Sequence, residues 1–318
     1  MEFRERAGRV SGRREWGEPL GVAGRGRYAC CKMVHAADEV RKQATSNLNA
    51  LPHFEAFSEL RNRLTALLAA RAAPDNSSRL CLLGAGNCYD VDLERLASLY
   101  REVHLVDIDT AALDRAWERQ SAPVRARLVR HPPLDLSGVL DRLERWRGLD
   151  VTSDELMSRP GAAAMEIASA LPGGFETVVS TCLLSQLQLS VLNVLSPTHA
   201  IFDAVRQVVN VTHLRTLAAL AGPAKGRALL VSDVSSNAIT PLGPFEPGAD
   251  LRGLLGELMR RGDVIHILRP DVIAQVVAED AALSVLMTAS PVLDAWLWQN
   301  GPERTFLVYA LELARRAA

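Results

Sequence analysis

The residues with the clearest chemical meaning are two glycines and an acid that follows them at a fixed distance. Gly84 and Gly86 lie just after the apolar run 80–83. Asp107 ends a second apolar run, 103–106, and lies 21 positions after Gly86. Glycines at a strand end let the backbone approach a ligand without a Cβ in the way. A carboxylate about 20 residues later meets ribose hydroxyls in nucleotide-binding folds. This spacing predicts a cofactor that contains adenosine.

The type of nucleotide depends on a glycine that is missing. A dinucleotide fingerprint, G-x-G-x-x-G, would place its last glycine at Tyr89. A bulky side chain there argues against a bound pyrophosphate, which needs close contact with the backbone. A sulfonium nucleoside such as S-adenosylmethionine has no phosphate and tolerates the substitution.

At these residues the chain resembles motif I and the acidic loop of the class I S-adenosylmethionine-dependent methyltransferases. The glycine run of that family is G-x-G-x-G, so Gly84 and Gly86 match, whereas Cys88 replaces the third glycine. The acid often found two residues before the first glycine is Leu82 here. Other polar side chains that could hold the methionine end are Asn87, Asp90 and Asp92. Either Asp90 or Asp92 should also cap the helix that follows this turn.

The resemblance also implies contacts to adenine after the third strand, where an acid bonds the amino group and the next amide reaches a ring nitrogen. Asp135 and Leu136 match that place, although Asp135 could instead cap a helix running from Ser137 toward Arg147. The resulting set of expected cofactor-binding residues is Gly84, Ala85, Gly86, Asn87, Asp107, Ile108, Asp135, Leu136, Thr181 and Cys182.

The catalytic residue is not identified by the sequence, and three side chains are candidates. Methyl transfer from a sulfonium requires alignment of the acceptor, and a base is needed only when the acceptor is protonated. Gln186 follows the fourth strand and could orient the acceptor or simply bond to backbone. His199 and His213 lie on a helix expected over 198–220, and for each a surface or core role is the better interpretation.

The elements that position these residues alternate between strand and helix. Extended runs lie at 80–83, 103–106, 126–129, 175–180 and 227–233. Strands that alternate with helices predict an α/β, doubly wound, mostly parallel sheet with right-handed crossovers and helices on both faces.

The last segment predicts an antiparallel hairpin, with arms at 292–298 and 304–313 around Asn300-Gly301. Class I methyltransferases end in such a hairpin, which gives a seven-stranded sheet. A nicotinamide dehydrogenase would more often end its cofactor half with a sixth parallel strand.

The chain divides into three expected regions. Residues 1–32 are rich in Arg and Gly and predict a disordered tail, 33–73 a helical cap, and 74–318 a class I methyltransferase-like domain. Met33 could be the true start or an internal methionine. Two helices, broken near Pro52, should precede the first strand. Leading helices often cover the substrate side of class I methyltransferases, so the resemblance makes Asn47, Asn49, His53 and Phe54 possible lid residues, although for any one of them packing on the sheet is the better interpretation.

Composition excludes several classes of function. The chain has 318 residues, 48% hydrophobic and 23% charged, with a formal net charge of -1. It therefore lacks the basic field of a nucleic-acid-binding protein, and no apolar run approaches the ~20 residues that span a membrane. We expect a cytoplasmic protein. The five cysteines have no C-x-x-C spacing and the histidines are scattered, so neither a disulfide framework nor a metal site is expected.

The leading hypothesis is S-adenosylmethionine-dependent methyl transfer to a small-molecule acceptor, with an O or N acceptor atom left open. The alternatives are an NAD(P)-dependent oxidoreductase and a noncatalytic S-adenosylmethionine-binding or interaction protein. No nucleic-acid or membrane partner is expected, and the oligomeric state is not determined by the sequence.

Overall fold

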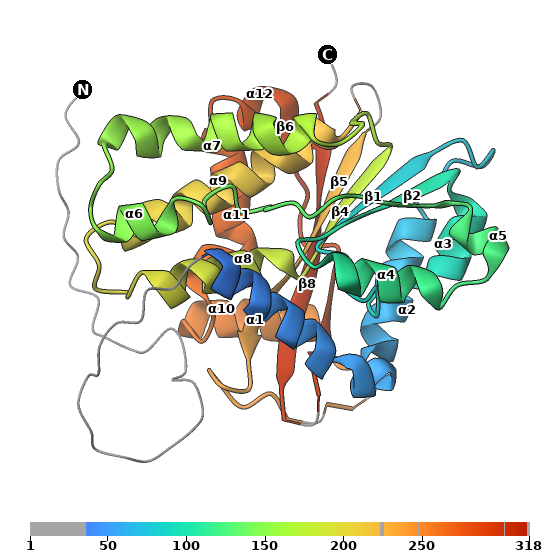
Figure 1. The fold of residues 1–318 in the computed structure, drawn as a ribbon. Helices are drawn as coiled ribbons and strands as arrows, with labels where there is room; N and C mark the ends of the chain where they lie inside the picture. Colours follow the sequence, from blue (N-terminus) through green and yellow to red (C-terminus); the bar gives the residue numbers. More distant parts are fainter. Residues whose placement is uncertain (1–35, 223–225, 244, 247, 302, 317–318) are drawn as a thin grey trace.

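The computed structural model describes residues 36–222, 226–243, 245–246, 248–301 and 303–316 (Figure 1). The expected disordered tail and Met33 lie outside the described residues. None of the described helices is both long and apolar enough to cross a membrane.

A single mixed sheet forms the centre of the fold. Its strands are β1 (Arg79–Leu83), β2 (Glu102–Val106), β3 (Leu128–Arg130), β4 (Thr177–Thr181), β5 (Arg227–Ser236), β6 (Met287–Ala289), β7 (Asp294–Gln299) and β8 (Thr305–Arg315). The order is β3-β2-β1-β4-β5-β8-β6, with β7 also paired to β8. Strands β1 to β5 are parallel and β8 is antiparallel to β5. The expected doubly wound sheet with a C-terminal hairpin is confirmed.

The sheet has eight strands, one more than expected, because the first arm of the hairpin is broken. β6 and β7 pair with successive parts of β8, and Pro291 lies between them. Proline has no N–H to donate to a ladder, so it interrupts the arm. The two segments occupy one edge position beside β8.

Helices cover both faces of the sheet (Figure 1). They are α1 (Ala36–Asn49), η1 (Leu51–Phe57), α2 (Ser58–Ala69), α3 (Leu93–Leu99), α4 (Thr110–Glu118), α5 (Ala122–Arg125), α6 (Leu143–Arg147), α7 (Ser153–Ser169), α8 (Leu183–Val194), α9 (Phe202–Leu220), α10 (Leu251–Arg261), η2 (His266–Leu268), α11 (Pro270–Glu279) and α12 (Leu283–Leu286). The expected break near Pro52 is present, because this proline lies in the first turn of the 3-10 helix η1.

Two apolar cores result from the alternation of side chains along the strands. In β1, Leu80 and Leu82 join the core formed with α2 to α5, whereas Cys81 and Leu83 join the core formed with α6 to α11. Buried on both faces, such strands are almost wholly apolar, as central parallel strands are.

Three helix starts differ from or refine the sequence analysis. Asp92, not Asp90, caps α3 by accepting from the backbone of Arg95, and Asp109 caps α4. The helix expected over 198–220 begins only at Phe202.

Candidate functional site

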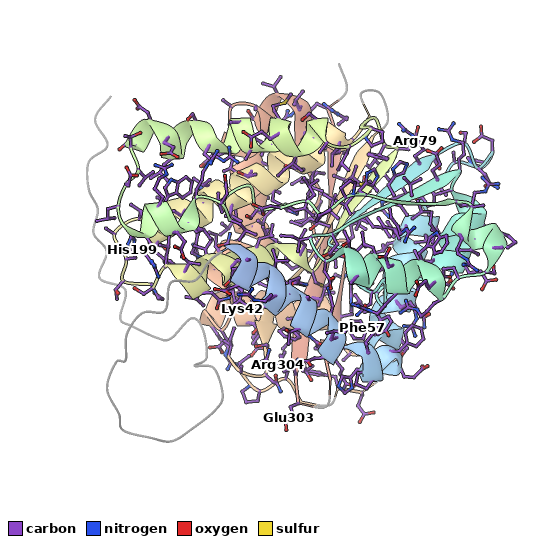
Figure 2. All side chains as sticks on the ribbon, viewed as in Figure 1. Lys42, Phe57, Arg79, His199, Glu303 and Arg304 are labelled. Carbon is purple, nitrogen blue, oxygen red and sulfur yellow. The ribbon has the colours of Figure 1, made fainter. Side chains whose placement is uncertain are left out.

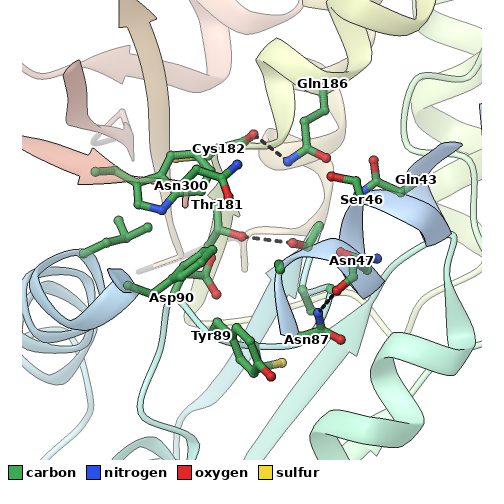
Figure 3. A pocket seen from close by; sticks show the side chains of 18 residues that line it. Gln43, Ser46, Asn47, Asn87, Tyr89, Asp90, Thr181, Cys182, Gln186 and Asn300 are labelled. Atoms are coloured by element: carbon green, nitrogen blue, oxygen red, sulfur yellow. Dashed lines mark hydrogen bonds between the residues drawn. The ribbon is translucent and has the colours of Figure 1, made fainter. Parts of the chain in front are cut away.

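Two adjoining pockets lie at the carboxyl ends of β1, β2 and β4. Pocket A is lined by Gln43, Ser46, Asn47, Ala50, Phe57, Leu60, Gly84, Ala85, Gly86, Asn87, Cys88, Tyr89, Asp90, Thr181, Cys182, Gln186, Trp298 and Asn300 (Figure 3). Pocket B is lined by Glu39, Lys42, Gln43, Ser46, Gly84, Asp107, Ile108, Leu134, Asp135, Leu136, Leu140, Leu183, Gln186, Leu187, Leu189, Ser190 and Asn193. Residues Gln43, Ser46, Gly84 and Gln186 line both, so the pockets meet there. In an open α/β sheet, ligands bind at this edge, where the strand order reverses.

The glycine turn forms the wall between the two pockets. Gly84 and Gly86 have φ values of 74° and 47°, in the left-handed region that glycine adopts without strain. A Cβ on Gly84 would lie 2.9 Å from the Cβ of Leu183. Cys88 also has a positive φ, 52°. The residue that replaces the third glycine of the family pattern therefore keeps a backbone conformation that glycine favours.

Asp107 directly follows β2, beside this turn. Its carboxylate accepts from the backbone N–H of Gly86 at 2.8 Å and of Asp109 at 2.9 Å. The side chain is buried, and burial raises its pKa while these two backbone donors oppose the rise. Because both donors fix its orientation, the carboxylate is presented to pocket B in one position, with further lone pairs able to accept from a ligand.

Asp135 and Leu136 also line pocket B, together with Ile108. The Asp135 carboxylate accepts from the backbone of Ser137 at 2.8 Å and of Leu140 at 3.1 Å. The sequence predicted a helix from Ser137 toward Arg147, but α6 spans only Leu143–Arg147. The prediction is therefore wrong for the first turns of that helix. The carboxylate instead stabilises the turn that precedes α6, so the alternative structural role of Asp135 is present in the fold.

Thr181 and Cys182 follow β4 and border pocket A (Figure 3). The Thr181 hydroxyl donates to the carbonyl of Gly84 at 3.1 Å, which ties the end of β4 to the glycine turn. Cys182 has a φ of 48°, and burial raises the pKa of its thiol well above the usual value. It is therefore a neutral thiol at neutral pH and no activated nucleophile.

The three catalytic candidates fall in different places. Gln186 lines both pockets and donates from Nε2 to the carbonyl of Cys182 at 3.2 Å. His199 and His213 line neither pocket. His199 bonds to the carbonyl of Arg147 at 2.9 Å and lies, in Figure 2, on the opposite side of the molecule from Phe57 of pocket A.

His213 is a core residue of α9. Its Nε2 pairs with the Ser180 hydroxyl at 2.8 Å, and its Nδ1 has no hydrogen-bond partner among the described residues. Burial lowers its pKa to about 4. A fully buried imidazole that stays neutral and faces no pocket has a structural role.

Helix α1 covers both pockets at the junction. Gln43 and Ser46 face Gln186 across pocket A in Figure 3. Asn47 donates to the Asp109 carboxylate at 2.9 Å and accepts, through its carbonyl, from Asn87 at 2.6 Å. Of the expected lid residues, Asn47 lines pocket A.

The other expected lid residues, Asn49, His53 and Phe54, line neither pocket. They belong to the last turn of α1 and to η1. The cover is therefore formed by side chains such as Gln43 and Ser46, which come earlier in α1 than the expected lid residues.

Sequence reasoning missed the part of pocket A contributed by distant segments. Phe57 and Leu60 come from η1 and α2, whereas Trp298 and Asn300 come from the hairpin. The position of Trp298 and Asn300 could have been predicted from the direction of the last strand. An antiparallel final strand begins at the edge where the parallel strands end, so the turn before it must lie beside the carboxyl ends of the sheet.

Asp90 is the carboxylate of pocket A. It is partly buried, and this burial raises its pKa to about 6. The nearby Thr181 hydroxyl and the Arg61 guanidinium oppose the rise, whereas the Asp107 charge adds to it. From the sequence, Asp90 was expected either to contact a methionine chain or to cap the following helix.

The described residues contain no cluster of three or more side chains suited to a metal ion. The cysteines in this part of the chain, Cys81, Cys88 and Cys182, are buried and free.

Comparison with known proteins gives fold-level likeness alone. The chain matches no protein-family profile and no curated protein. It is similar to the solved structure of magnesium protoporphyrin IX methyltransferase from Synechocystis PCC 6803 with bound SAH, at 12% identity, TM-score 0.40, and coverage of 93% of this chain and 90% of that one.

Two further solved structures are similar to a comparable degree. The glycopeptide N-methyltransferase MtfA complexed with S-adenosyl-L-methionine has 14% identity, TM-score 0.40, and coverage of 81% and 88%. A putative RNA methyltransferase, PH1948 from Pyrococcus horikoshii, has 13% identity, TM-score 0.38, and coverage of 82% and 84%.

Since these scores are low, the assignment rests on this chain's own features. The parallel strands, the glycine turn after β1, the acid that follows β2 and the antiparallel hairpin are those that the sequence resemblance implies. The chain has the fold of the class I methyltransferases.

Proposed function

We propose that this protein binds S-adenosylmethionine and transfers its methyl group to a small-molecule acceptor. The observation that carries the proposal is the direct bond between the Asp107 carboxylate and the backbone of Gly86. This bond holds the acid and the glycine turn together between the two adjoining pockets. A nucleoside with an attached chain would place its nucleoside in one pocket and its chain toward the other.

The helix that follows the glycine turn argues against a dinucleotide. A pyrophosphate is normally held by free N–H groups at the start of that helix. Here α3 begins at Leu93, seven residues after Gly86, and the Asp92 carboxylate already accepts from its first turn. Asp90 lies between the two and lines pocket A, so a pyrophosphate there would meet a carboxylate in place of free donors.

Pocket B suits the adenosine part. Asp107 would accept from the ribose hydroxyls, and Ile108 would lie beside the sugar and base. Leu134, Leu136 and Leu140 supply an apolar wall for a planar base. Asp135 and the Leu136 amide would contact the adenine edge, although the Asp135 oxygens also hold the Ser137 turn.

The methionine part would extend from the junction along the glycine turn. Gly84, Ala85, Gly86 and Asn87 would approach it through backbone and amide groups, with Thr181 and Cys182 opposite. The bound cofactor supplies an activated methyl group. The protein's own contribution is to position the acceptor in pocket A and to exclude water, which α1 assists by covering the junction.

A small acceptor fits pocket A better than a nucleic acid does. Among the described residues that line this pocket there is no lysine or arginine to pair with phosphates. The cytoplasmic location expected from the sequence stays a prediction.

Calorimetry with S-adenosylhomocysteine and with NADH tests the proposal. We expect micromolar or tighter binding of S-adenosylhomocysteine and none of NADH at the same concentration. Binding of NADH in place of S-adenosylhomocysteine would establish the oxidoreductase alternative. Tight cofactor binding without methylation of any acceptor in an extract incubated with labelled cofactor would favour a noncatalytic protein.

A further inference from the structure

The charges around pocket A restrict the acceptor that it can hold. Asp90 is the one carboxylate among its lining residues, and the described part of the chain supplies no lysine, arginine or histidine to that lining. An anionic acceptor would have to enter beside this carboxylate with no basic side chain in the lining to pair with it, which is unfavourable in a partly buried site. A cation would be stabilised in the same place.

The carboxylate of Asp90 is not needed to start the following helix. The residue that caps α3 is Asp92, which is separated from Asp90 by Val91 in the sequence. Asp90 instead lines the pocket next to Thr181 and Cys182, at the end of β4 (Figure 3). Thr181, which interacts with Asp90, donates to the carbonyl of Gly84, and Gly84 lines both pockets. Asp90 therefore lies one side chain away from the junction, where a group that receives a methyl from a bound cofactor would lie.

Aromatic rings form another side of the same pocket. Phe57 packs edge-on against Tyr89 and Trp298, with ring centroids 5.7 Å and 5.5 Å apart. Aromatic faces attract cations, and the Tyr89 ring already holds the Arg119 guanidinium 4.6 Å from its centroid. Trp298 stacks on Phe306, so the rings add an apolar aromatic wall beside the one carboxylate of the pocket.

We propose that the acceptor is a small primary or secondary amine, bound as an ammonium ion by Asp90. This inference rests on the proposed function and names the substrate class of the same site. Asp90 serves as the base that receives the proton of the amine.

The proton and electron balance of this step is complete within the site. The ammonium N–H bond breaks and the proton goes to the Asp90 carboxylate, which leaves the nitrogen lone pair free. That pair forms the new N–C bond to the methyl carbon, while the S–C bond breaks and its electron pair stays on sulfur. The products are a methylated ammonium ion, S-adenosylhomocysteine and protonated Asp90, which then returns its proton to water.

The ionisation of Asp90 sets the pH range of amine binding. Burial raises its pKa to about 6, and the charged or titratable groups near it are Arg61 of α2, Asp107 after β2, Cys88 of the glycine turn and Cys182 after β4. At pH 7.5 Asp90 is a carboxylate and binds the cation. As the pH falls through 6 it becomes neutral, and amine affinity falls with it.

Binding to the S-adenosylhomocysteine-loaded protein tests the inference without turnover. We would titrate two matched probe pairs, 2-phenoxyethylamine with phenoxyacetate and ethanolamine with glycolate, by calorimetry at pH 7.5 and 5.0. We expect at least one amine to bind and neither carboxylate to do so. Asp90→Asn should weaken amine binding by tenfold or more and remove its pH dependence, while S-adenosylhomocysteine affinity stays within threefold of the wild type.

Asp92→Asn is the matched control, because asparagine caps helices as well as aspartate does. It should change neither amine nor cofactor binding. Absence of binding by both amines, binding of the carboxylates, or unchanged amine binding in Asp90→Asn would overturn the inference. Loss of S-adenosylhomocysteine binding in Asp90→Asn would assign this carboxylate to the cofactor, which refutes the inference but not the proposed function. Failure of the wild type to bind S-adenosylhomocysteine would instead refute the proposed function.

Discussion

Replacing Asp107 with asparagine removes the charge that we assign to the ribose hydroxyls while keeping the size of the side chain. In the structure both carboxylate oxygens accept backbone N–H groups, at 2.8 Å and 2.9 Å. An amide keeps one acceptor and turns its NH₂ group toward the other backbone donor. Two effects follow, a loss of cofactor affinity and a loss of stability.

The loss of affinity can be derived from the strength of charge-assisted hydrogen bonds. A bond to a charged group contributes about 1.5–3 kcal/mol, so the dissociation constant for S-adenosylhomocysteine should rise by about 10- to 150-fold. The unsatisfied backbone donor should lower the free energy of unfolding by about 1–3 kcal/mol. Calorimetry measures the first effect and urea denaturation the second.

Asp109→Asn is the control for a general disturbance of this loop. Asp109 is buried two residues further on, caps α4 and lines neither pocket. Asparagine can keep the cap but not the charge that faces Arg115 at 3.6 Å, so this replacement should lower stability by under about 1 kcal/mol and leave S-adenosylhomocysteine affinity within threefold. If Asp107→Asn folds normally and binds S-adenosylhomocysteine as the wild type does, the assignment of Asp107 to the ribose is refuted.

Three further substitutions test the local geometry. Gly84→Ala would force a side chain into a φ of 74° and bring its Cβ within 2.9 Å of α8. The free energy of unfolding measured by urea denaturation should therefore fall by at least about 2 kcal/mol. The control is Gly243→Ala, where the added Cβ meets open space and stability should change by under about 0.5 kcal/mol. The pKa of His213 is lowered to about 4 in the folded state, so the unfolded chain binds the extra proton between pH 6.5 and 4 and stability is lost as the pH falls through this range. His213→Gln should therefore remove about 3 kcal/mol of the pH dependence of unfolding between pH 7 and 4, and an unchanged dependence would contradict the burial of a neutral imidazole. Asn47→Ala removes the bond to the α4 cap, so hydrogen exchange in α1 should accelerate several-fold, while Asn49→Ala on the exposed side of that helix should leave it unchanged.

The sequence by itself determined the sheet and its ligand-binding edge. Apolar runs of four or five residues, separated by helical patterns, specify parallel strands because such strands are buried on both faces. The two extended runs on either side of Asn300-Gly301 indicated the hairpin, whose connection is longer than a two-residue turn because Gln299 pairs with Thr305. These signals are local, because they depend on backbone conformation and on the period of side chains along one element.

The tertiary structure alone decided which side chains meet. Trp298 and Phe57 are far apart in the sequence and pack together only because β7 lies against η1 and α2. The sequence left Asp90 and Asp92 as equal candidates for a cap, and packing assigned the cap to Asp92 and the pocket to Asp90. Likewise His213 faces Ser180 because α9 packs on β4. Such outcomes depend on contacts between distant segments, which no local pattern encodes.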